Sequence, residues 1–237
     1  MSEAELMRDH ILARSFYIRT LRKASLARDR SLVGISGLIV VLLLFGALPR
    51  AYAHRNSTRE METLGGSTSI GYAINTQGQV TGESATADGK IRAFLFTPDR
   101  GVADLGTLGG SSSIGHAINA HGQVTGWSVT RDGAMHAFLY TQGTGMIDLG
   151  TLGGNTSVAY AINARGQVAG ESVTSNDKMH AFLFADGTMR DLNSMVDRAI
   201  AVRMTLISGR GISDRGWILV NGVDATSDET RSYLLRK

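Results

Sequence analysis

The stretch DLGTLGGSSSIGHAINAHGQVTGWSVTRDGAMHAFLY, residues 104–140, decides the fold because the chain is built from copies of it. It recurs as DLGTLGGNTSVAYAINARGQVAGESVTSNDKMHAFLF at residues 148–184, and 24 of the 37 aligned positions are identical. An earlier copy spans residues 60–96, and a divergent fourth copy spans residues 191–235. The chain is therefore a repeat protein, and its fold follows from what one unit can form.

The spacing of the copies predicts strands rather than helices. Corresponding residues of the first three copies are 44 positions apart, as in Ile74, Ile118 and Ile162. A period of about 40–45 residues with several short strands is typical of a β-propeller blade. Helical solenoids of similar period need amphipathic runs of ten or more residues, which these copies do not contain. The 29 glycines and 2 prolines also fit short strands joined by tight turns, so we predict an all-β fold.

Each copy offers four candidate strands, which in the second copy are residues 102–105, 114–118, 123–129 and 135–140. The Gly109-Gly110 pair is expected to break the first strand from the second. Asn119 and Gly122 occupy the first and fourth positions of a turn, which is the preference of a type I turn. A second hairpin is expected at Asp132-Gly133, because glycine accommodates a positive φ.

The AFLF and AFLY runs that end these copies are apolar on both faces, which fits a sheet packed on both sides. One copy cannot bury such faces alone, so the copies must stack. A closed four-bladed ring, an open four-sheet stack and two chains that complete a larger ring would all meet this demand. In the fourth copy, Ser194 and Asp197 have capping-box spacing, which predicts a short helix. We predict a small β-propeller-like array of four four-stranded repeats, at residues 60–103, 104–147, 148–190 and 191–237.

The first 53 residues differ from the repeats in charge, with a net +4 against −1 for the rest of the chain. A basic segment, residues 1–30, precedes an uncharged hydrophobic run at residues 31–49 and a small-x-small site ending at Ala53. This order is typical of a secretory signal peptide cleaved after Ala53. The uncharged run is also close to the ~20 residues that span a bilayer, so an uncleaved signal anchor is the alternative. Both predict a hydrophobic N-terminal helix, a linker at residues 54–59, and repeats in the periplasm or outside the cell.

Composition and motifs exclude several classes of function. The nearly neutral repeats lack the basic stripe of a nucleic-acid surface, so no nucleic-acid partner is expected. The sequence has no cysteine, which excludes disulfides, thiolate chemistry and cysteine-based zinc sites. It contains no G-x-S-x-G, H-E-x-x-H or phosphate-loop motif. The hairpin residues Asp88, Asp132 and Asn176 give one oxygen each, too few for calcium. We expect no catalytic residue, metal or cofactor, and a membrane contact only through an uncleaved leader.

TLGG and AIN followed by QV recur in fixed order in the first three copies, and HAFL follows them in the second and third. In this respect residues 60–236 resemble the HAF repeat family, an extracellular repeat of exported bacterial proteins. The resemblance implies an exported protein with a propeller-like β fold, and it implies no activity or functional residue. This sequence departs from the motif at Arg92, which stands where the later copies have His136 and His180.

The candidate site residues are polar or aromatic positions that turn chemistry does not explain. A glutamine opens the same strand in three copies, and we expect it to bond across repeats or to face a central channel. His136 and His180 are instead interpreted as strand-edge residues bonded to a neighbouring repeat, because Arg92 and Arg231 replace them in the other copies. The predicted binding residues are Gln79, Gln123, Gln167, Trp127 and Trp217.

Two functions are compatible with these observations. The first is a non-catalytic exported repeat domain, which binds or scaffolds an extracellular ligand or protein, with a second copy of the chain as a candidate partner. The second is a propeller enzyme acting on an extracellular glycan. An enzyme needs residues that break the repeat to converge in one pocket, and the positions that break it are Arg92, Trp127, Arg210, Asp214, Arg215 and Trp217.

Overall fold

The computed structural model describes residues 58–236. The expected hydrophobic helix, its signal or anchor role and the Ala53 cleavage site lie outside the described residues. Within them the prediction of an all-β fold is confirmed, because strands dominate and the two helices are short.

The strands form four groups of antiparallel neighbours in chain order, called sheets 1 to 4, and a parallel bridge joins the second and third groups into one eight-stranded sheet. Sheet 1 contains β1 (Gly65–Ile74), β2 (Val80–Thr86), β3 (Ile91–Thr97) and β4 (Gly101–Asp104). Sheet 2 contains β5 (Gly109–Ile118), β6 (Val124–Thr130), β7 (Met135–Thr141) and β8 (Gly145–Asp148). Sheet 3 contains β9 (Gly153–Ile162), β10 (Val168–Thr174), β11 (Met179–Ala185) and β12 (Thr188–Asp191). Sheet 4 contains β13 (Met204–Ile212), β14 (Trp217–Asp224) and β15 (Thr230–Arg236).

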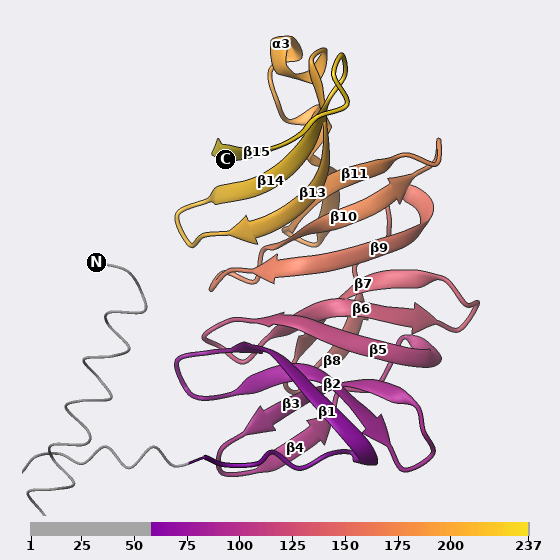
Figure 1. Cartoon of the computed structure of the whole chain (residues 1–237), viewed down its shortest axis with the longest axis vertical. Coiled ribbons are helices and arrows are strands. Elements are labelled where there is room, and N and C mark those ends of the chain that lie inside the picture. Colours follow the sequence, from indigo (N-terminus) through magenta and orange to yellow (C-terminus); the bar gives the residue numbers. More distant parts are fainter. Residues whose placement is uncertain (1–57, 237) are drawn as a thin grey trace, which may run out of the picture. The chain divides into compact units, whose positions relative to one another are not determined.

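The sheets stack one on the next in the order of the sequence (Figure 1). None of them closes on itself, and sheets 1 and 4 lie at opposite ends of the stack. A single parallel bridge between Met135 of β7 and Thr156 of β9 joins sheets 2 and 3. The described unit therefore does not close into a four-bladed ring by itself, and both the open stack and the ring completed by two chains remain compatible with it.

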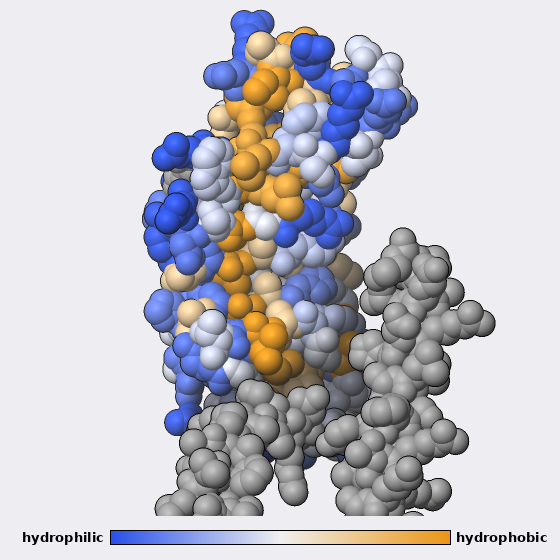
Figure 2. Space-filling view, turned by 60° about the vertical axis from the view of Figure 1, so that its left-hand side comes forward, coloured by the Kyte–Doolittle hydropathy of each residue, from blue (hydrophilic) through white to orange (hydrophobic). Residues whose placement is uncertain are grey.

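The hydrophobic core lies between the sheets. One cluster of buried residues, including Leu95 and Phe138, joins sheets 1 and 2. A second, including Leu139 and Phe182, joins sheets 2 and 3, and a third joins sheets 3 and 4 around Leu183. On the face shown in Figure 2, hydrophobic residues gather in a band that runs along the stack between hydrophilic flanks. Each boundary core therefore depends on two successive repeats, as the apolar runs predict.

The predicted boundaries between repeats do not coincide with the boundaries between sheets. The segment expected to open the second unit, residues 102–105, lies mostly in β4, and β4 pairs with β3 of the preceding sheet. The Leu105 N–H then donates to the Ala93 carbonyl, so the chain leaves sheet 1 only after this residue. Sequence periodicity gives the length of a unit but not the point at which one sheet ends.

The expected break at Gly109-Gly110 is wrong, because both glycines belong to β5. The strand passes them with a register irregularity between Gly109 and Ser113. A Cβ atom on Gly110 would lie 2.5 Å from the Thr130 carbonyl oxygen, so only glycine allows the two strands to approach there. The two glycines therefore allow β5 to continue where its backbone lies very close to β6.

The predicted turns are present. Gly122 N–H donates to the Asn119 carbonyl, and Gly133 has a φ of 89°. In the fourth copy, the predicted helix appears as a 3-10 turn, η1 (Leu192–Ser194), and a short helix, α3 (Arg198–Ala201). Asp191, not Ser194, caps η1 by accepting from the Asn193 N–H, and Asp197 precedes α3 without a side-chain bond. Helical turns here leave sheet 4 with three strands instead of the predicted four.

Candidate functional site

The first strand of each sheet carries a β-bulge at the same place. In sheets 1 and 2, Tyr72 and His116 are the extra residues opposite a continuous partner strand. In sheets 3 and 4, Tyr160 and Arg210 take this position. A bulge leaves one residue unpaired and changes the direction of its side chain. The four extra residues, Tyr72, His116, Tyr160 and Arg210, are called the inner-strand column.

Local sequence explains why the bulge forms in the first three sheets. A glycine lies opposite it on the second strand, at Gly82, Gly126 and Gly170. A Cβ atom on Gly126 would lie 1.9 Å from the Ile114 carbonyl oxygen, and Gly82 and Gly170 are similarly close to the facing strand. Glycine is therefore required for this close approach.

The column is held together by stacking across the sheets. The rings of His116 and Tyr160 are 5.4 Å apart and nearly parallel, at 9°. Tyr72 meets His116 edge to face at 6.1 Å, and the Arg210 guanidinium lies 4.1 Å above the Tyr160 ring. His116 Nδ1 is also 2.9 Å from the Ala159 carbonyl oxygen of sheet 3. These contacts make one row of planar groups that spans all four sheets.

A second row runs beside the column on the second strands, where Glu83, Trp127, Glu171 and Asn221 occupy equivalent positions. The Tyr160 hydroxyl donates to Glu171 Oε1 over 2.8 Å. Burial, followed by this hydrogen bond and the carboxylate charge, raises the pKa of Tyr160 to about 12, although Arg210 opposes the shift. Burial and the nearby Glu83 also raise the pKa of Tyr72. Both tyrosines therefore offer neutral hydroxyls at physiological pH.

The three predicted glutamines lie in a structural network between sheets. Each side-chain oxygen accepts from the asparagine of its own turn, as Gln123 Oε1 does from Asn119 Nδ2 over 2.7 Å. Gln79 and Gln123 pack against the glycine of the next turn, at Gly122 and Gly166 respectively. Gln167 accepts from Asn163 in the same way. The expected hydrogen bonds across repeats are not seen among the described residues, because each glutamine bonds within its own sheet and only Gln79 and Gln123 contact the next turn, by packing.

The turn asparagines extend this network from sheet to sheet. Asn75 Nδ2 donates to the Asn119 carbonyl oxygen over 3.0 Å, and Asn119 Nδ2 donates to the Asn163 carbonyl oxygen over 2.9 Å. Asn163 continues the series to the Ser213 carbonyl oxygen over 3.1 Å. The turn interpretation of these asparagines is correct but incomplete, because each also connects two sheets. This series of amide-to-carbonyl bonds is called the asparagine ladder.

The two tryptophans lie on different sheets. Trp127 is half-buried in β6, within the second row beside the column. Trp217 is 36% exposed at the start of β14, and the Arg236 guanidinium lies 5.2 Å from its ring. Trp127 therefore shares a region with the column, and Trp217 does not occupy an equivalent position.

The two motif histidines bond within their own sheet rather than to a neighbouring one. His136 Nδ1 is 2.8 Å from Asp148 Oδ2, and His180 Nδ1 is 2.6 Å from Asp191 Oδ2. Each pair joins the third strand of its sheet to the end of the fourth. In sheet 1, Arg92 occupies the equivalent position, and its Nε lies 4.0 Å from Asp104 Oδ2. The prediction that His136 and His180 bond to a neighbouring repeat was therefore wrong. Their role in joining two strands of one sheet nevertheless explains why arginine can replace histidine.

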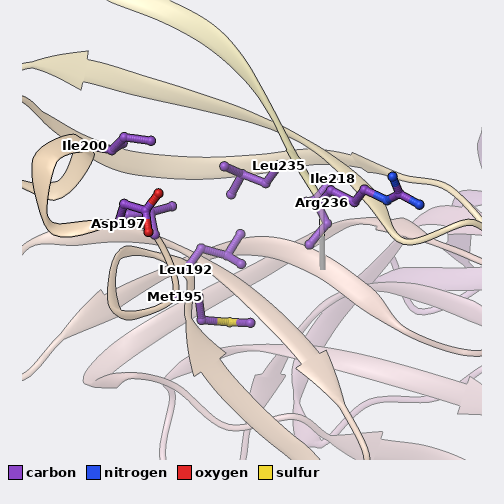
Figure 3. A pocket seen from close by; sticks show the side chains of 8 residues that line it. Leu192, Met195, Asp197, Ile200, Ile218, Leu235 and Arg236 are labelled. Carbon is purple, nitrogen blue, oxygen red and sulfur yellow. The ribbon is translucent and has the colours of Figure 1, made fainter.

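The six positions that break the repeat do not line one pocket. Arg210 joins the column, Asp214 accepts from the Ala164 N–H, and Trp217 pairs with Arg236. A pocket of about 320 Å³ lies on sheet 4 among mainly apolar side chains, with Asp197 and Arg236 at its two sides (Figure 3). None of the six lines it. Among residues 58–236 no group of three or more histidine or acidic side chains could hold a metal ion.

The column itself was not predicted from the sequence. The signal that could have found it is a position that changes from copy to copy within a constant frame: SIGY, SIGH, SVAY and SGR. Its residues change identity but remain planar groups that can stack. The glycine of TGE, TGW and AGE, which faces this position, reveals the close approach that produces the bulge.

No family model and no curated protein matches the chain. Among solved structures, the chain is similar to TolB from Acinetobacter baumannii, with 14% sequence identity and a TM-score of 0.43. The match covers 71% of this chain and 46% of that one, so the chain spans less than half of that protein's length. In the part of the chain that the structure describes, no helix is long and apolar enough to cross a membrane.

Proposed function

We propose that the described repeats are a non-catalytic binding module of an exported protein, and that the ligand binds along the inner-strand column. The observation that carries this proposal is the bulge at one position in all four sheets. At that position the repeat keeps its backbone geometry but varies the side chain. Variation on a constant frame is what ligand recognition by a repeat protein requires, because the frame positions the groups and the groups provide specificity.

The chemistry of the two rows suits an extended, polyhydroxylated ligand such as a glycan. The faces of His116 and Tyr160 are already stacked, so a ligand would meet ring edges, the carboxylates of Glu83 and Glu171, and the Arg210 guanidinium. Carboxylates and guanidinium groups accept and donate several hydrogen bonds to hydroxyls. Trp127 adds an apolar surface among them.

Export and a propeller-like arrangement belong to this proposal. The basic leader followed by an uncharged run supports export, and the resemblance of residues 60–236 to the HAF repeat supports both. The stack of sheets with cores at their boundaries is also what successive blades of a propeller would form.

A catalytic role has less support from the same residues. Glu83 and Glu171 are two sheets apart, and one oxygen of Glu171 already accepts from Tyr160. A glycosidase needs two carboxyl groups that flank one bond. Of the six positions that break the repeat, only Arg210 and Trp127 lie at the column, which gives little support to the convergence that the enzyme hypothesis requires.

Tryptophan fluorescence tests the binding proposal at the site itself. The chain contains two tryptophans, so a Trp217→Phe variant leaves Trp127 as the single reporter. A glycan array would select candidates, and chitohexaose, cellohexaose and hexagalacturonate would be titrated into this variant. We expect a saturable change in Trp127 emission with one of these sugars or with an array hit.

Two variants control this measurement. Glu83→Gln should weaken binding about tenfold, since one charged hydrogen bond contributes about 1.5–3 kcal/mol. Ile147→Asp, on β8 away from both rows, should leave binding unchanged. A ligand that binds without changing Trp127 emission, or that ignores Glu83→Gln, would place its site elsewhere. Cleavage of a bound sugar would contradict the proposed binding module and support the enzyme hypothesis.

A further inference from the structure

The fourth strands of sheets 1, 2 and 3 share one pattern of side chains. They end in VAD, MID and MRD, and a leucine follows each of them, which gives residues 102–105, 146–149 and 189–192. An apolar residue is thus followed two positions later by an aspartate and then by a leucine. Each of these strands pairs antiparallel with the third strand of its sheet. The four-residue pattern is called the fourth-strand motif.

Each position of the motif makes a defined contact, as sheet 2 shows. Met146 packs against the core between sheets 1 and 2. Asp148 bonds to His136 of the third strand. Leu149 is buried in the core between sheets 2 and 3, and its N–H donates to the Ala137 carbonyl. The motif therefore closes the outer edge of its sheet and contributes to the core on either side of it.

Sheet 4 has the edge for such a strand but not the strand itself. Among residues 58–236, β15 pairs only with β14, so its outer edge has no strand partner. Arg231 of β15 stands where the other sheets have Arg92, His136 and His180, which face the aspartates of the motif. Here Arg231 pairs instead with Glu229 of its own strand over 2.5 Å, and both side chains are mostly exposed. An exposed pair of this kind contributes little to stability, so an incoming acid could replace Glu229.

The pocket on sheet 4 corresponds to the position of the first motif residue. Three apolar residues of the boundary between sheets 3 and 4 line it: Leu192, Ile218 and Leu235 (Figure 3). The residues at the same three positions of the boundary between sheets 1 and 2 are Leu105, Val124 and Tyr140. All three belong to or pack on the core against which Met146 packs. The pocket of about 320 Å³ is therefore the counterpart of the space that Met146 fills.

An exposed leucine corresponds to the last motif residue. Leu95 and Leu139 are buried in boundary cores that also contain the motif leucines Leu105 and Leu149. Leu234 takes the same position in sheet 4 and is 61% exposed. The open edge, the pocket, Arg231 and Leu234 thus match the backbone and the three defined side chains of one absent strand.

We propose that the outer edge of β15 binds an extended acidic segment of another protein that carries the fourth-strand motif. Its apolar residue enters the pocket, its acid faces Arg231 and its leucine covers Leu234. Strand addition of this kind derives affinity from main-chain hydrogen bonds and specificity from alternate side chains. A second copy of this chain fits less well, because its own motifs already pair in sheets 1, 2 and 3. Pairing β15 with β15 would also bring the arginines of both edges, Arg231 and Arg236, together.

Fluorescence anisotropy with a labelled peptide tests the proposal. The probe is fluorescein-labelled GMIDLG, the sequence of residues 145–150, and the protein is the full chain in lipid nanodiscs, with empty nanodiscs as the blank. We expect saturable binding in the micromolar range. Replacing the methionine or the leucine of the peptide by serine should weaken binding about tenfold, because each change removes an apolar contact. Leu234→Ser should have a similar effect on the protein side.

The charge at Arg231 identifies the contact. Arg231→Gln should weaken binding of GMIDLG about tenfold and leave binding of GMINLG, which lacks the acid, unchanged. Glu229→Gln should tighten binding of GMIDLG, because it frees Arg231. Arg131→Gln, at an exposed arginine between β6 and β7, is the matched control and should bind like the wild-type chain.

The altered side chains are exposed, so far-UV circular dichroism of every variant should match the wild-type chain. Absence of saturable binding would overturn the proposal, and it is the result expected if a second copy or another segment of this chain already fills the edge. Equal binding of GMIDLG and GMINLG, or equal binding of GMIDLG by Arg231→Gln and wild type, would also overturn it, because the peptide would then not lie opposite Arg231.

Discussion

The two boundaries among sheets 1, 2 and 3 and the boundary between sheets 3 and 4 have the same geometry but different polar contacts. At the first two, Ser113 and Ser157 accept from the Ala93 and Ala137 N–H groups of the preceding sheet. At the third, Asn193 instead bonds to both backbone groups of Leu206. A buried backbone group needs a partner but not a particular one, so the stack tolerates a divergent sheet wherever each group is satisfied.

The ladder shows the same difference at the turns. Asn163 still donates to sheet 4, but Ser213 accepts at its carbonyl oxygen and passes no amide onward. Asp214 adds a compensating bond by accepting from the Ala164 N–H over 2.7 Å. Sheet 4 therefore accepts the ladder hydrogen bond from sheet 3 but has no asparagine amide to donate to a further sheet. A stack can end at a sheet of this kind.

The largest expected effect comes from the boundary cores. Phe138→Ala should reduce the free energy of unfolding by about 3–5 kcal/mol, because this ring is fully buried between sheets 1 and 2. Tyr233 takes the equivalent place in sheet 4 but is only partly buried, so Tyr233→Ala should cost less. Urea unfolding of the two variants measures the difference. Equal losses would mean that the divergent boundary is packed as tightly as the others.

The ladder gives the next largest effect. Asn119→Ala should reduce the free energy of unfolding by about 2–4 kcal/mol, because four hydrogen bonds end at this buried side chain. Ser213→Ala is the matched change in sheet 4, where the side chain is exposed and accepts from one N–H, so it should cost under about 1 kcal/mol. Thermal unfolding of both variants separates the two cases. A large loss for Ser213→Ala would contradict the view that the ladder ends there.

A small stabilisation is expected at Ser208. Its hydroxyl is buried and has no hydrogen-bond partner among the described residues, whereas the equivalent residues Ile70, Ile114 and Val158 are apolar. Ser208→Ala removes the unpaired group and should stabilise the fold by up to about 1 kcal/mol. The change in melting temperature measures this. A destabilised variant would show that the hydroxyl is bonded in solution, for instance through water.

The smallest effect concerns pH at the column. The folded pKa of Tyr160, about 12, lies above its unfolded value, so the associated stability is complete below about pH 10 and is lost as pH rises toward 12. Titration of tyrosinate absorbance, with Tyr160→Phe as the difference reference, measures this ionisation. Glu171→Gln should lower the pKa only partly, since burial is the larger cause. Ionisation of Tyr160 near pH 10 would contradict the partial burial of this side chain and its hydrogen bond to Glu171.

The sequence predicted what depends on local pattern and missed what depends on strand pairing. The Asn119 turn and the positive φ of Gly133 follow from residue preferences, and the apolar AFLY run correctly indicates packing on both sides. The continuity of β5 through Gly109-Gly110 could not be predicted, because those glycines reflect a close approach to β6. Tyr72, His116 and Tyr160 were missed because their shared direction depends on a bulge, which pairing alone reveals.

The position of the hydrophobic clusters has a consequence for how such a gene can change. One 44-residue unit contributes one sheet and one boundary, and its neighbours need no new surface to receive it. Unequal crossing-over that inserts or deletes a whole unit between copies one and three would leave each boundary with a complete core in a protein of different length. Lengths that are not multiples of the unit would disrupt two boundaries at once, so such genes should grow and shrink in whole steps.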